Sequence, residues 1–392
     1  MYLVLAVICL LSPVLAISLA IGQFCHTRCV VPNALLMALG MGVLAMGLAN
    51  TAGGDLTTYA EEAASYARLS FSETLVMKYG SYPLAAFEFW ISGHLGNPHF
   101  FQLINGSIEY GIMFYIIFDY AKRNDFLNRQ IITSAALTLL IVPLFNSVSA
   151  IRTTPAFFIG VLALYRDVYQ GRRGALTIAL YIAPGLIHSA GWSVLGIRLL
   201  TGILKKSRLL CFVAGIAIIP ALLLVAFAAE PLLSWIGIDT VSKLVEYSRQ
   251  SASGWAATVS ASTFYSLYRL FNICFVLCCA IPLSLSKGIA QQKDRLLLNC
   301  TLTALGLILG FCLFMEDPSF MRYSYAFYPL VVLIACKTIL RGAHRFVWFV
   351  VFVSSAVFFV SQVYLLSIGA SVPSFLSTLL FGIFGSPWLL GA

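Results

Sequence analysis

Apolar runs of roughly 18 to 22 residues recur from one end of this chain to the other, and each is long enough to cross a bilayer as a helix. At ~1.5 Å per residue, such a helix spans the ~30 Å hydrocarbon core. Hydrophobic residues make up 60% of the chain and charged residues 10%, and the mean hydropathy is +0.92. These values exclude an ordinary soluble protein. The sequence therefore predicts an all-α polytopic membrane protein.

We expect about twelve membrane helices. The first run has no charged segment before it and no small-x-small cleavage site, so we expect a retained span rather than a signal peptide. The expected spans cover residues 2–22, 33–50, 100–120, 130–147, 152–170, 174–190, 192–204, 208–228, 263–285, 296–315, 322–340 and 346–368.

The rest of the chain belongs to the same single membrane domain, 1–392, because no linker or internal repeat divides it. Two large connectors, about 51–99 and 230–262, are expected outside the membrane. Within the first, residues 82–91 are predicted to form a helix at the interface, and 240–254 could form an amphipathic helix in the second. The apolar tail 371–392 is either an interfacial or re-entrant helix or a weak thirteenth span.

The net charge of +9 reflects membrane topology rather than nucleic-acid binding. Basic residues gather in every second connector, as the positive-inside rule requires of cytoplasmic loops. The remaining connectors are therefore expected outside, together with the N-terminus. The basic residues are Arg28; Lys122, Arg123 and Arg129; Arg166, Arg172 and Arg173; Lys205, Lys206 and Arg208; Lys287, Lys293 and Arg295; and Lys337, Arg341 and Arg345.

Arg152 and His188 are the most informative pair of candidate residues. Arg152 opens one span and His188 closes the next, so both are expected at the same membrane surface, where they are suited to binding a phosphate. Arg198 lies inside the following short span, where a charge is costly unless it faces a cavity or a partner. The alternative is that Arg152 extends toward lipid headgroups and that His188 is an ordinary interfacial residue.

A second candidate follows the second span, in Gly53-Gly-Asp-Leu-Thr-Thr-Tyr59. If a helix begins there, Asp55 and Tyr59 share one face. Asp55 could equally cap that helix, and the two roles are compatible.

A third candidate is Arg322 with the tyrosines that follow it, Tyr323, Tyr325 and Tyr328. A cation followed by phenolic rings suits a diphosphate-sugar, because aromatic faces stack on sugars and hydroxyls bond their oxygens. An interfacial aromatic belt is the alternative.

Two further charges are expected within the membrane. Glu109 and Arg269 fall roughly 9 to 14 Å into their spans, where charges line a wet cavity or pair with one another. A structural ion pair between Glu109 and an arginine is the alternative.

No cofactor or metal is expected. The sequence lacks a P-loop, a dinucleotide-binding glycine motif, a Gly-x-Ser-x-Gly elbow and a His-Glu-x-x-His helix. Cys25-His-Thr-Arg-Cys29 offers two thiols and one histidine without a second pair, which is a weak metal signal.

In order along the chain, these motifs resemble the Wzy/EpsG-type polysaccharide polymerases of bacterial O-antigen, lipopolysaccharide, capsule and exopolysaccharide systems. The resemblance covers most of the chain in short, scattered motifs, of which the block from Arg152 to His188 is the most specific. The other motifs are Asp55 and Tyr59, the segment with Tyr82 and Phe87, Gln102-Leu-Ile-Asn105, and Arg322 with its tyrosines.

The resemblance implies a GT-C-like, metal-independent glycosyltransferase in the bacterial plasma membrane. Its donor and acceptor would be undecaprenyl-diphosphate-linked oligosaccharides, joined on the outer face, with a chain-length regulator and a flippase as further partners. Arg152, Arg198, Arg269 and Arg322 would stabilise the leaving diphosphate, and Asp55 or His188 would deprotonate the acceptor hydroxyl. The alternatives are a flippase or other transporter of lipid-linked oligosaccharides, a ligase, and another membrane glycosyl- or acyltransferase.

Overall fold

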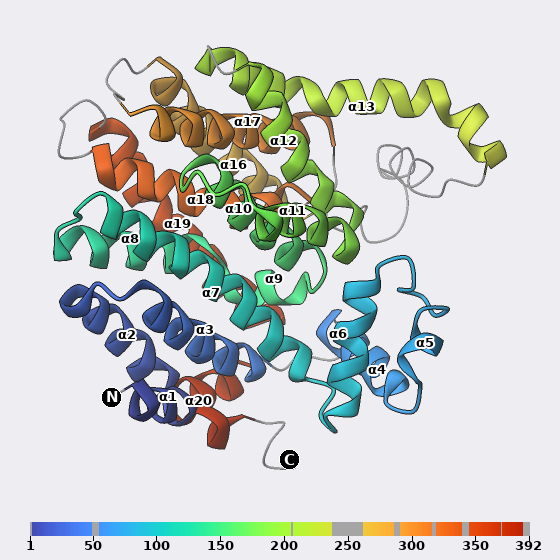
Figure 1. Cartoon of the computed structure of the whole chain (residues 1–392), viewed down its shortest axis with the longest axis vertical. Helices are drawn as coiled ribbons and strands as arrows, with labels where there is room; N and C mark the ends of the chain where they lie inside the picture. The colour runs from blue at the N-terminus through green and yellow to red at the C-terminus, as the bar shows by residue number, and fades with distance from the viewer. Residues whose placement is uncertain are drawn as a thin grey trace. The chain divides into compact units, whose positions relative to one another are not determined.

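The computed structural model describes residues 2–48, 55–204, 207–236, 262–285, 291–315, 319–338, 345–369 and 371–386, and these are helical with short connections (Figure 1). The chain divides into two compact units, Met1–Leu195 with Ser355–Ala392, and Gly196–Ser354. Helices α12 (Trp192–Ile203) and α19 (Arg345–Gly369) run across the two boundaries.

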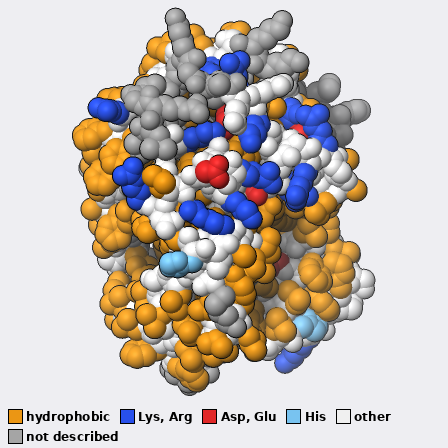
Figure 2. Space-filling view, turned by 60° about the vertical axis from the view of Figure 1, so that its left-hand side comes forward, with side chains coloured by type: hydrophobic (Ala, Val, Ile, Leu, Met, Phe, Trp, Pro, Cys, Tyr) orange, Lys and Arg blue, Asp and Glu red, His pale blue; other side chains and the backbone are white. Residues whose placement is uncertain are grey.

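The membrane class predicted from the sequence is supported by the helices themselves. Among the described residues, five helical segments are long and apolar enough to cross a membrane: Phe100–Arg123, Arg208–Val225, Thr263–Leu285, Gln292–Phe314 and Arg345–Tyr364. Shorter apolar helices accompany them. Hydrophobic side chains also cover wide areas of the surface (Figure 2), as expected where lipid rather than water is the solvent.

The first unit contains both the expected spans at the start of the chain and the first large connector. Its helices are α1 (Tyr2–Leu11), α2 (Pro13–Thr27), α3 (Val30–Met46), α4 (Asp55–Tyr66), α5 (Phe71–Thr74), α6 (Pro83–His94), α7 (Phe100–Arg123), α8 (Asn128–Ile141), α9 (Leu144–Ser149), α10 (Thr153–Val168), α11 (Ala175–Ile187) and α20 (Val372–Phe381), with 3-10 turns at Ser189–Gly191 and Gly382–Gly385.

Prolines divide two of the expected spans. The expected helix 2–22 is separated into α1 and α2 at Ser12, because Pro13 has no N–H to donate and restricts the residue before it. The expected helix 130–147 ends at Ile141, and the short α9 begins after Pro143. Each expected span is therefore two shorter helices.

Helices α3 and α7 lie side by side along much of their length (Figure 1). Glycines allow this approach: a Cβ added at Gly42 would lie 2.8 Å from the Leu103 carbonyl oxygen, and one at Gly106 would lie 2.7 Å from the Ala45 Cβ. The same device of small residues is typical of membrane helix pairs.

The large connector 55–99 is a folded helical layer. The helix expected over 82–91 is present as α6, and α4 begins at Asp55, where the sequence predicts a helix. Buried side chains from α4 and α6, among them Leu56 and Phe89, pack in one core with Phe101 of α7 and with Val148 of α9. This packing fixes the connector on the ends of α3, α7 and α9.

The C-terminal tail also packs within the first unit. Helix α20 has ten residues and reaches only ~15 Å, too short to span a bilayer. It contacts α2 and α3, and the turn after it contacts α1. Gly382 has φ +56°, and a Cβ there would lie 1.9 Å from the Leu10 carbonyl oxygen, so the turn requires glycine.

The second unit contains α13 (Arg208–Ile236), α16 (Thr263–Leu285), α17 (Gln292–Phe314) and α18 (Ser319–Thr338). Helix α13 continues beyond the expected end at 228 into the second large connector. Helices α13 and α17 approach closely through Gly215 and Gly306, whose added Cβ atoms would meet the Thr303 and Phe212 carbonyl oxygens at 2.2 and 2.1 Å. The amphipathic helix expected over 240–254 lies outside the described residues, as do Gly53 and Gly54.

Candidate functional site

Arg152 and His188 occupy the helix ends that the sequence predicts. Arg152 immediately precedes α10 and His188 immediately follows α11, which contains Pro184 within its last turn. His188 has an extended backbone, φ −158° and ψ 135°, which ends the helix and starts the turn Ser189–Gly191. Because α10 and α11 are packed neighbours joined by a short turn, both residues lie at the same end of this pair.

The ring of Tyr82 joins the two residues. The guanidinium carbon of Arg152 lies 5.8 Å from the centre of the Tyr82 ring, and the same ring stacks on His188 at a centroid distance of 5.9 Å and an interplanar angle of 11°. Arg152 also lies over Tyr79, at 4.4 Å. We call Arg152, His188, Tyr79 and Tyr82 the Arg152 cluster.

The folded connector supplies both tyrosines. Tyr82 directly precedes α6, whose first residue is Pro83, a residue suited to the first turn because it has no N–H to leave unpaired. Tyr79 is buried and stacks on Phe89 of α6 at 4.9 Å. The core that holds the connector on the transmembrane helices therefore also fixes the two rings beneath Arg152.

The hydrogen bonds of the cluster define what each group can offer a ligand. The Nδ1 atom of His188 accepts a hydrogen bond from the Ala190 N–H at 3.2 Å. In the neutral ring the proton is then on Nε2, which is a donor. The Nε of Arg152 is buried without a hydrogen-bond partner among the described residues. The cluster thus presents a cation and an N–H donor, the combination that binds phosphate oxygens.

Glu109 lies in a buried polar group close to this cluster. It is fully buried on α7, and its Oε2 accepts a hydrogen bond from the Ser147 hydroxyl of α9. Asn105, one turn earlier on α7, is also fully buried. Glu88 of α6 has a buried Oε1, and burial together with the nearby Glu109 carboxylate raises its pKa well above the ordinary value. The ion pair with an arginine, one alternative for Glu109, is absent from the ion pairs among the described residues.

Tyr59 and Asp55 belong to α4, on the same folded connector. The Tyr59 ring is half-buried and packs against Phe89 at 5.9 Å and Phe101 at 6.3 Å. Helix α4 begins at Asp55, and the side chain of that residue lies outside the description. Tyr59 therefore contributes to the core of the connector.

The tyrosines after Arg322 pack inside the second unit. Tyr323, Tyr325 and Tyr328 are all buried, Tyr323 against Phe311 at 5.0 Å. The Tyr328 hydroxyl donates to Asn272 Oδ1 at 2.7 Å. Because they are buried, Tyr325 and Tyr328 differ from the exposed residues of an interfacial aromatic belt. Arg322, on the same helix, is only partly buried.

The two other candidate arginines of the second unit, Arg269 and Arg198, have separate surroundings. The Nε of Arg269 on α16 donates to the Cys312 carbonyl at 2.5 Å, near the C-terminal end of α17. A cation there complements the negative end of the helix dipole. Arg198 on α12 is partly buried, and a Cβ added at Gly202 would lie 3.1 Å from its Nη1.

The ends of α7 and α10 that lie away from the Arg152 cluster carry charged side chains, among them Arg123. Tyr165 near the end of α10 donates to Asp119 Oδ2 near the end of α7 at 2.9 Å, and Arg123 donates to the same oxygen at 2.6 Å. Helices α7 and α10 therefore run in the same direction. Since α7 has 24 residues, this end is roughly 35 Å from its start.

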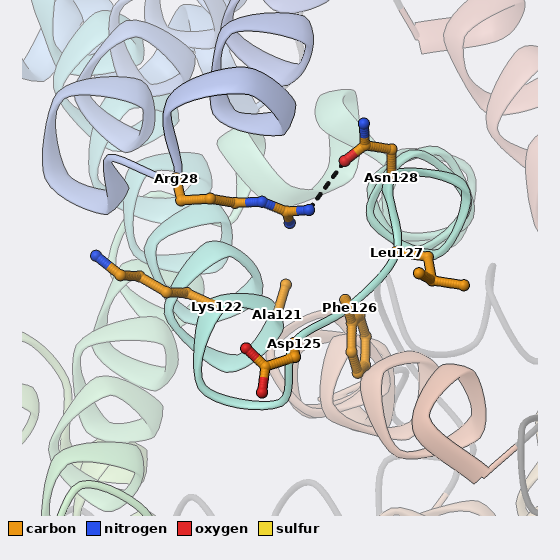
Figure 3. Close-up of a pocket in the computed structure, with 7 residues that line it drawn as sticks. All are labelled: Arg28, Ala121, Lys122, Asp125, Phe126, Leu127 and Asn128. Atoms are coloured by element: carbon orange, nitrogen blue, oxygen red, sulfur yellow. Dashed lines mark hydrogen bonds between the residues drawn. The ribbon is translucent and has the colours of Figure 1, made fainter.

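A cavity of about 640 Å³ lies at this basic end, between the α2–α3 turn and the α7–α8 connection. Arg28 extends across it and donates to Asn128 Oδ1 at 2.9 Å, whereas the Lys122 amine points away from that guanidinium (Figure 3). Asp125 faces the same space, so the lining carries both signs of charge. The cavity is separate from the Arg152 cluster.

Sequence reasoning did not assign Tyr79 or Glu88 to the site, and it named Tyr82 only within one of the motifs that carry the resemblance. Glu88 carried a usable signal, a carboxylate inside the apolar run Phe87-Glu-Phe-Trp90, which is the same signal that identified Glu109. Tyr79 carried none, because its position beneath Arg152 depends on how the connector folds back.

Among the described residues, no group of three or more histidine, cysteine, aspartate or glutamate side chains is arranged to hold a metal ion. Comparison with protein families, characterised proteins and solved structures finds no match to this chain.

Proposed function

We propose that this multi-pass membrane protein is a polysaccharide polymerase that joins lipid-diphosphate-linked oligosaccharide repeat units. The observation that supports this most is the Arg152 cluster, in which a cation and an N–H donor both lie against one tyrosine ring. The order of motifs along the chain, which resembles Wzy/EpsG-type polymerases, agrees with it. On that resemblance, the fold is GT-C-like, the lipid is undecaprenyl diphosphate, and the site faces the outside of the bacterial plasma membrane.

In this reaction the acceptor hydroxyl attacks the anomeric carbon of the donor, and the bond from that carbon to the diphosphate breaks. The lipid diphosphate leaves with the electron pair, and the hydroxyl proton is released. Arg152 stabilises the charge that develops on the leaving diphosphate, and the Nε2–H of His188 donates to the same group. On the resemblance, Arg322, Arg198 and Arg269 are further candidates for stabilising the diphosphate.

A further group must act as the base that takes the proton from the acceptor hydroxyl. His188 Nδ1 is engaged with the Ala190 N–H, and a neutral His188 carries its proton on Nε2. Of the two bases that the resemblance suggests, this favours Asp55 and gives His188 the role of a donor.

The test is a gel of lipid-linked glycan from cells that carry or lack this chain. A polymerase predicts a ladder that collapses to a single repeat, accessible on the outer leaflet, when the chain is removed. Single repeats held on the inner leaflet would instead indicate a flippase, and full-length polymer retained on its lipid carrier would indicate a ligase. Either result refutes the proposal.

Variants assign the roles within that assay. Arg152→Ala is expected to shorten the ladder to single repeats, whereas Arg68→Ala, which removes an exposed arginine from the connector 55–99, leaves it unchanged. Arg322→Ala should also stop chain lengthening at an unchanged protein level. Normal polymer from either arginine variant contradicts its diphosphate role.

Asp55 is tested against a neighbour on the same helix. Asp55→Asn should lower the rate of chain lengthening by about 100-fold or more if Asp55 is the base, because a positioned base contributes at least that much. Glu61→Gln removes an exposed carboxylate two turns along α4 and should have no effect. Equal effects of the two changes reduce Asp55 to a capping residue.

A further inference from the structure

Buried polar atoms without partners gather on one face of α7, opposite α6 and α9. On α7 they are Asn105 Oδ1 and Glu109 Oε1, about one turn apart on one face of the helix. The Asn105 amide is hydrogen-bonded to Glu88, and Gln102 is hydrogen-bonded to His99. On α6 the atoms without partners are Glu88 Oε1 and Ser92 Oγ. We call Glu88, Ser92, Asn105 and Glu109 the α6–α7 polar group. Because an unpaired buried polar atom costs about 1 to 3 kcal/mol, such a group requires a physical explanation.

The chemistry of these atoms indicates what is missing. Three of them are acceptor oxygens, one on each of Asn105, Glu88 and Glu109, and only the Ser92 hydroxyl can donate. The Glu109 oxygen Oε2 is already held by Ser147. An excess of acceptors in a buried site is balanced by a bound positive species, and the simplest one is a proton.

The two carboxylates are placed so that they affect one another. Glu109 is fully buried, and its negative charge is the second cause, after burial, that raises the pKa of Glu88. Two carboxylates in a buried site do not both ionise, because the repulsion between them adds to the cost of removing each charge from water. With one proton, one carboxyl donates to the other or to Asn105, and the acceptors are satisfied.

Few other titratable groups compete for this proton. Helices α3 and α9 carry no titratable side chain. The groups on the other elements packed against α6 and α7 near this end are Tyr59, Glu61, Glu62 and Tyr66 of α4, Glu73 of α5, His99 before α7, Arg152 before α10 and His188 after α11. Glu62 is engaged with Lys78 at 3.2 Å and Glu73 with Ser70 at 2.7 Å.

We propose that Glu88 and Glu109 share one proton at neutral pH and form a buried proton-accepting pair behind the Arg152 cluster. Glu88 lies six residues after Tyr82, roughly 9 Å along the axis of α6, and Ser147 lies five residues before Arg152. The role of the pair in the reaction rests on the proposed function. The proton that Asp55 takes from the acceptor hydroxyl passes on to the pair, which becomes neutral on both carboxyls, and is then released to water.

Infrared spectroscopy of the purified full chain tests the shared proton without any assay of activity. We expect the C=O stretching band of a protonated carboxyl group at pH 7, shifted in D₂O. The band should be lost or altered in Glu109→Gln and in Glu88→Gln but kept in the control Glu61→Gln. If either glutamine variant fails to fold, Ser147→Ala serves instead: both carboxyls remain, and losing the Ser147 hydrogen bond should shift the band.

Three outcomes overturn the inference. The band is absent at pH 7, it is unchanged in Glu109→Gln, Glu88→Gln and Ser147→Ala, or it disappears when sodium replaces choline at constant pH, which makes the group a cation site. The reaction role is tested separately by the rate of chain lengthening, expected to fall by about 100-fold or more in Glu109→Gln. If Glu109→Gln alters the band but still makes a normal ladder, the two carboxyls share a proton but take no part in the reaction. If the wild-type protein shows no polymerase activity, the proposed function fails and the infrared result still stands.

Discussion

Replacing Tyr82 tests whether its ring holds Arg152 and His188 in position. Tyr82→Leu removes one cation–π contact, at 5.8 Å, and one stacked ring pair, at 5.9 Å. These contacts contribute about 0.5–1 and 0.5–1.5 kcal/mol respectively. If the whole loss appears in the transition state, the barrier rises by about 1 to 2.5 kcal/mol, which lowers kcat/KM by about 5- to 70-fold. Tyr82→Phe keeps the ring and should stay within about twofold of the wild type.

The assay is the initial rate of chain lengthening in membrane vesicles, at matched protein level. Phe71→Leu is the control, because it removes an aromatic ring of the same connector that packs edge-on against Phe87 and Trp90 rather than against the Arg152 cluster. Tyr82→Leu at the wild-type rate would refute the positioning role. A Tyr82→Phe variant as slow as Tyr82→Leu would move the role from the ring to the hydroxyl.

Three further predictions concern stability. Ser147→Ala leaves a Glu109 oxygen without its donor, so the free energy of unfolding should fall by about 1–3 kcal/mol in denaturant titration, and an unchanged midpoint contradicts the buried bond. Burial lowers the pKa of His99 from 6.5 to about 4, so the unfolded chain binds the proton more readily. The contribution of His99 to stability should therefore be complete above about pH 6.5 and fall by up to about 3 kcal/mol as the pH approaches 4. His99→Gln should abolish this loss when thermal unfolding is followed against pH, whereas the exposed His94→Gln should leave it in place. Gly306→Val should force α17 away from the Phe212 carbonyl and lower the thermal midpoint, whereas the exposed Gly196→Val, with open space around it, should cost far less.

The sequence determined which parts of the chain are apolar helices and which helix ends carry charge. Hydropathy is a local property, so runs such as 263–285 match the helix Thr263–Leu285, and Arg152 and His188 lie at the predicted helix ends. The prolines that divide 2–22 and 130–147 are also evident in the sequence. Because each apolar run is long enough for one span, the sequence predicts a single helix where the structure has two.

Only the tertiary structure decided what lies next to these residues. Tyr79 and Tyr82 come under Arg152 because the connector 55–99 folds back onto α7 and α9, which depends on contacts between residues distant in the sequence. The same folding places Glu88 beside Glu109, two carboxylates that are 21 positions apart in the chain. Periodicity records which face of a helix is apolar and not which helix covers it, so the cluster and the carboxyl pair follow from packing rather than from pattern.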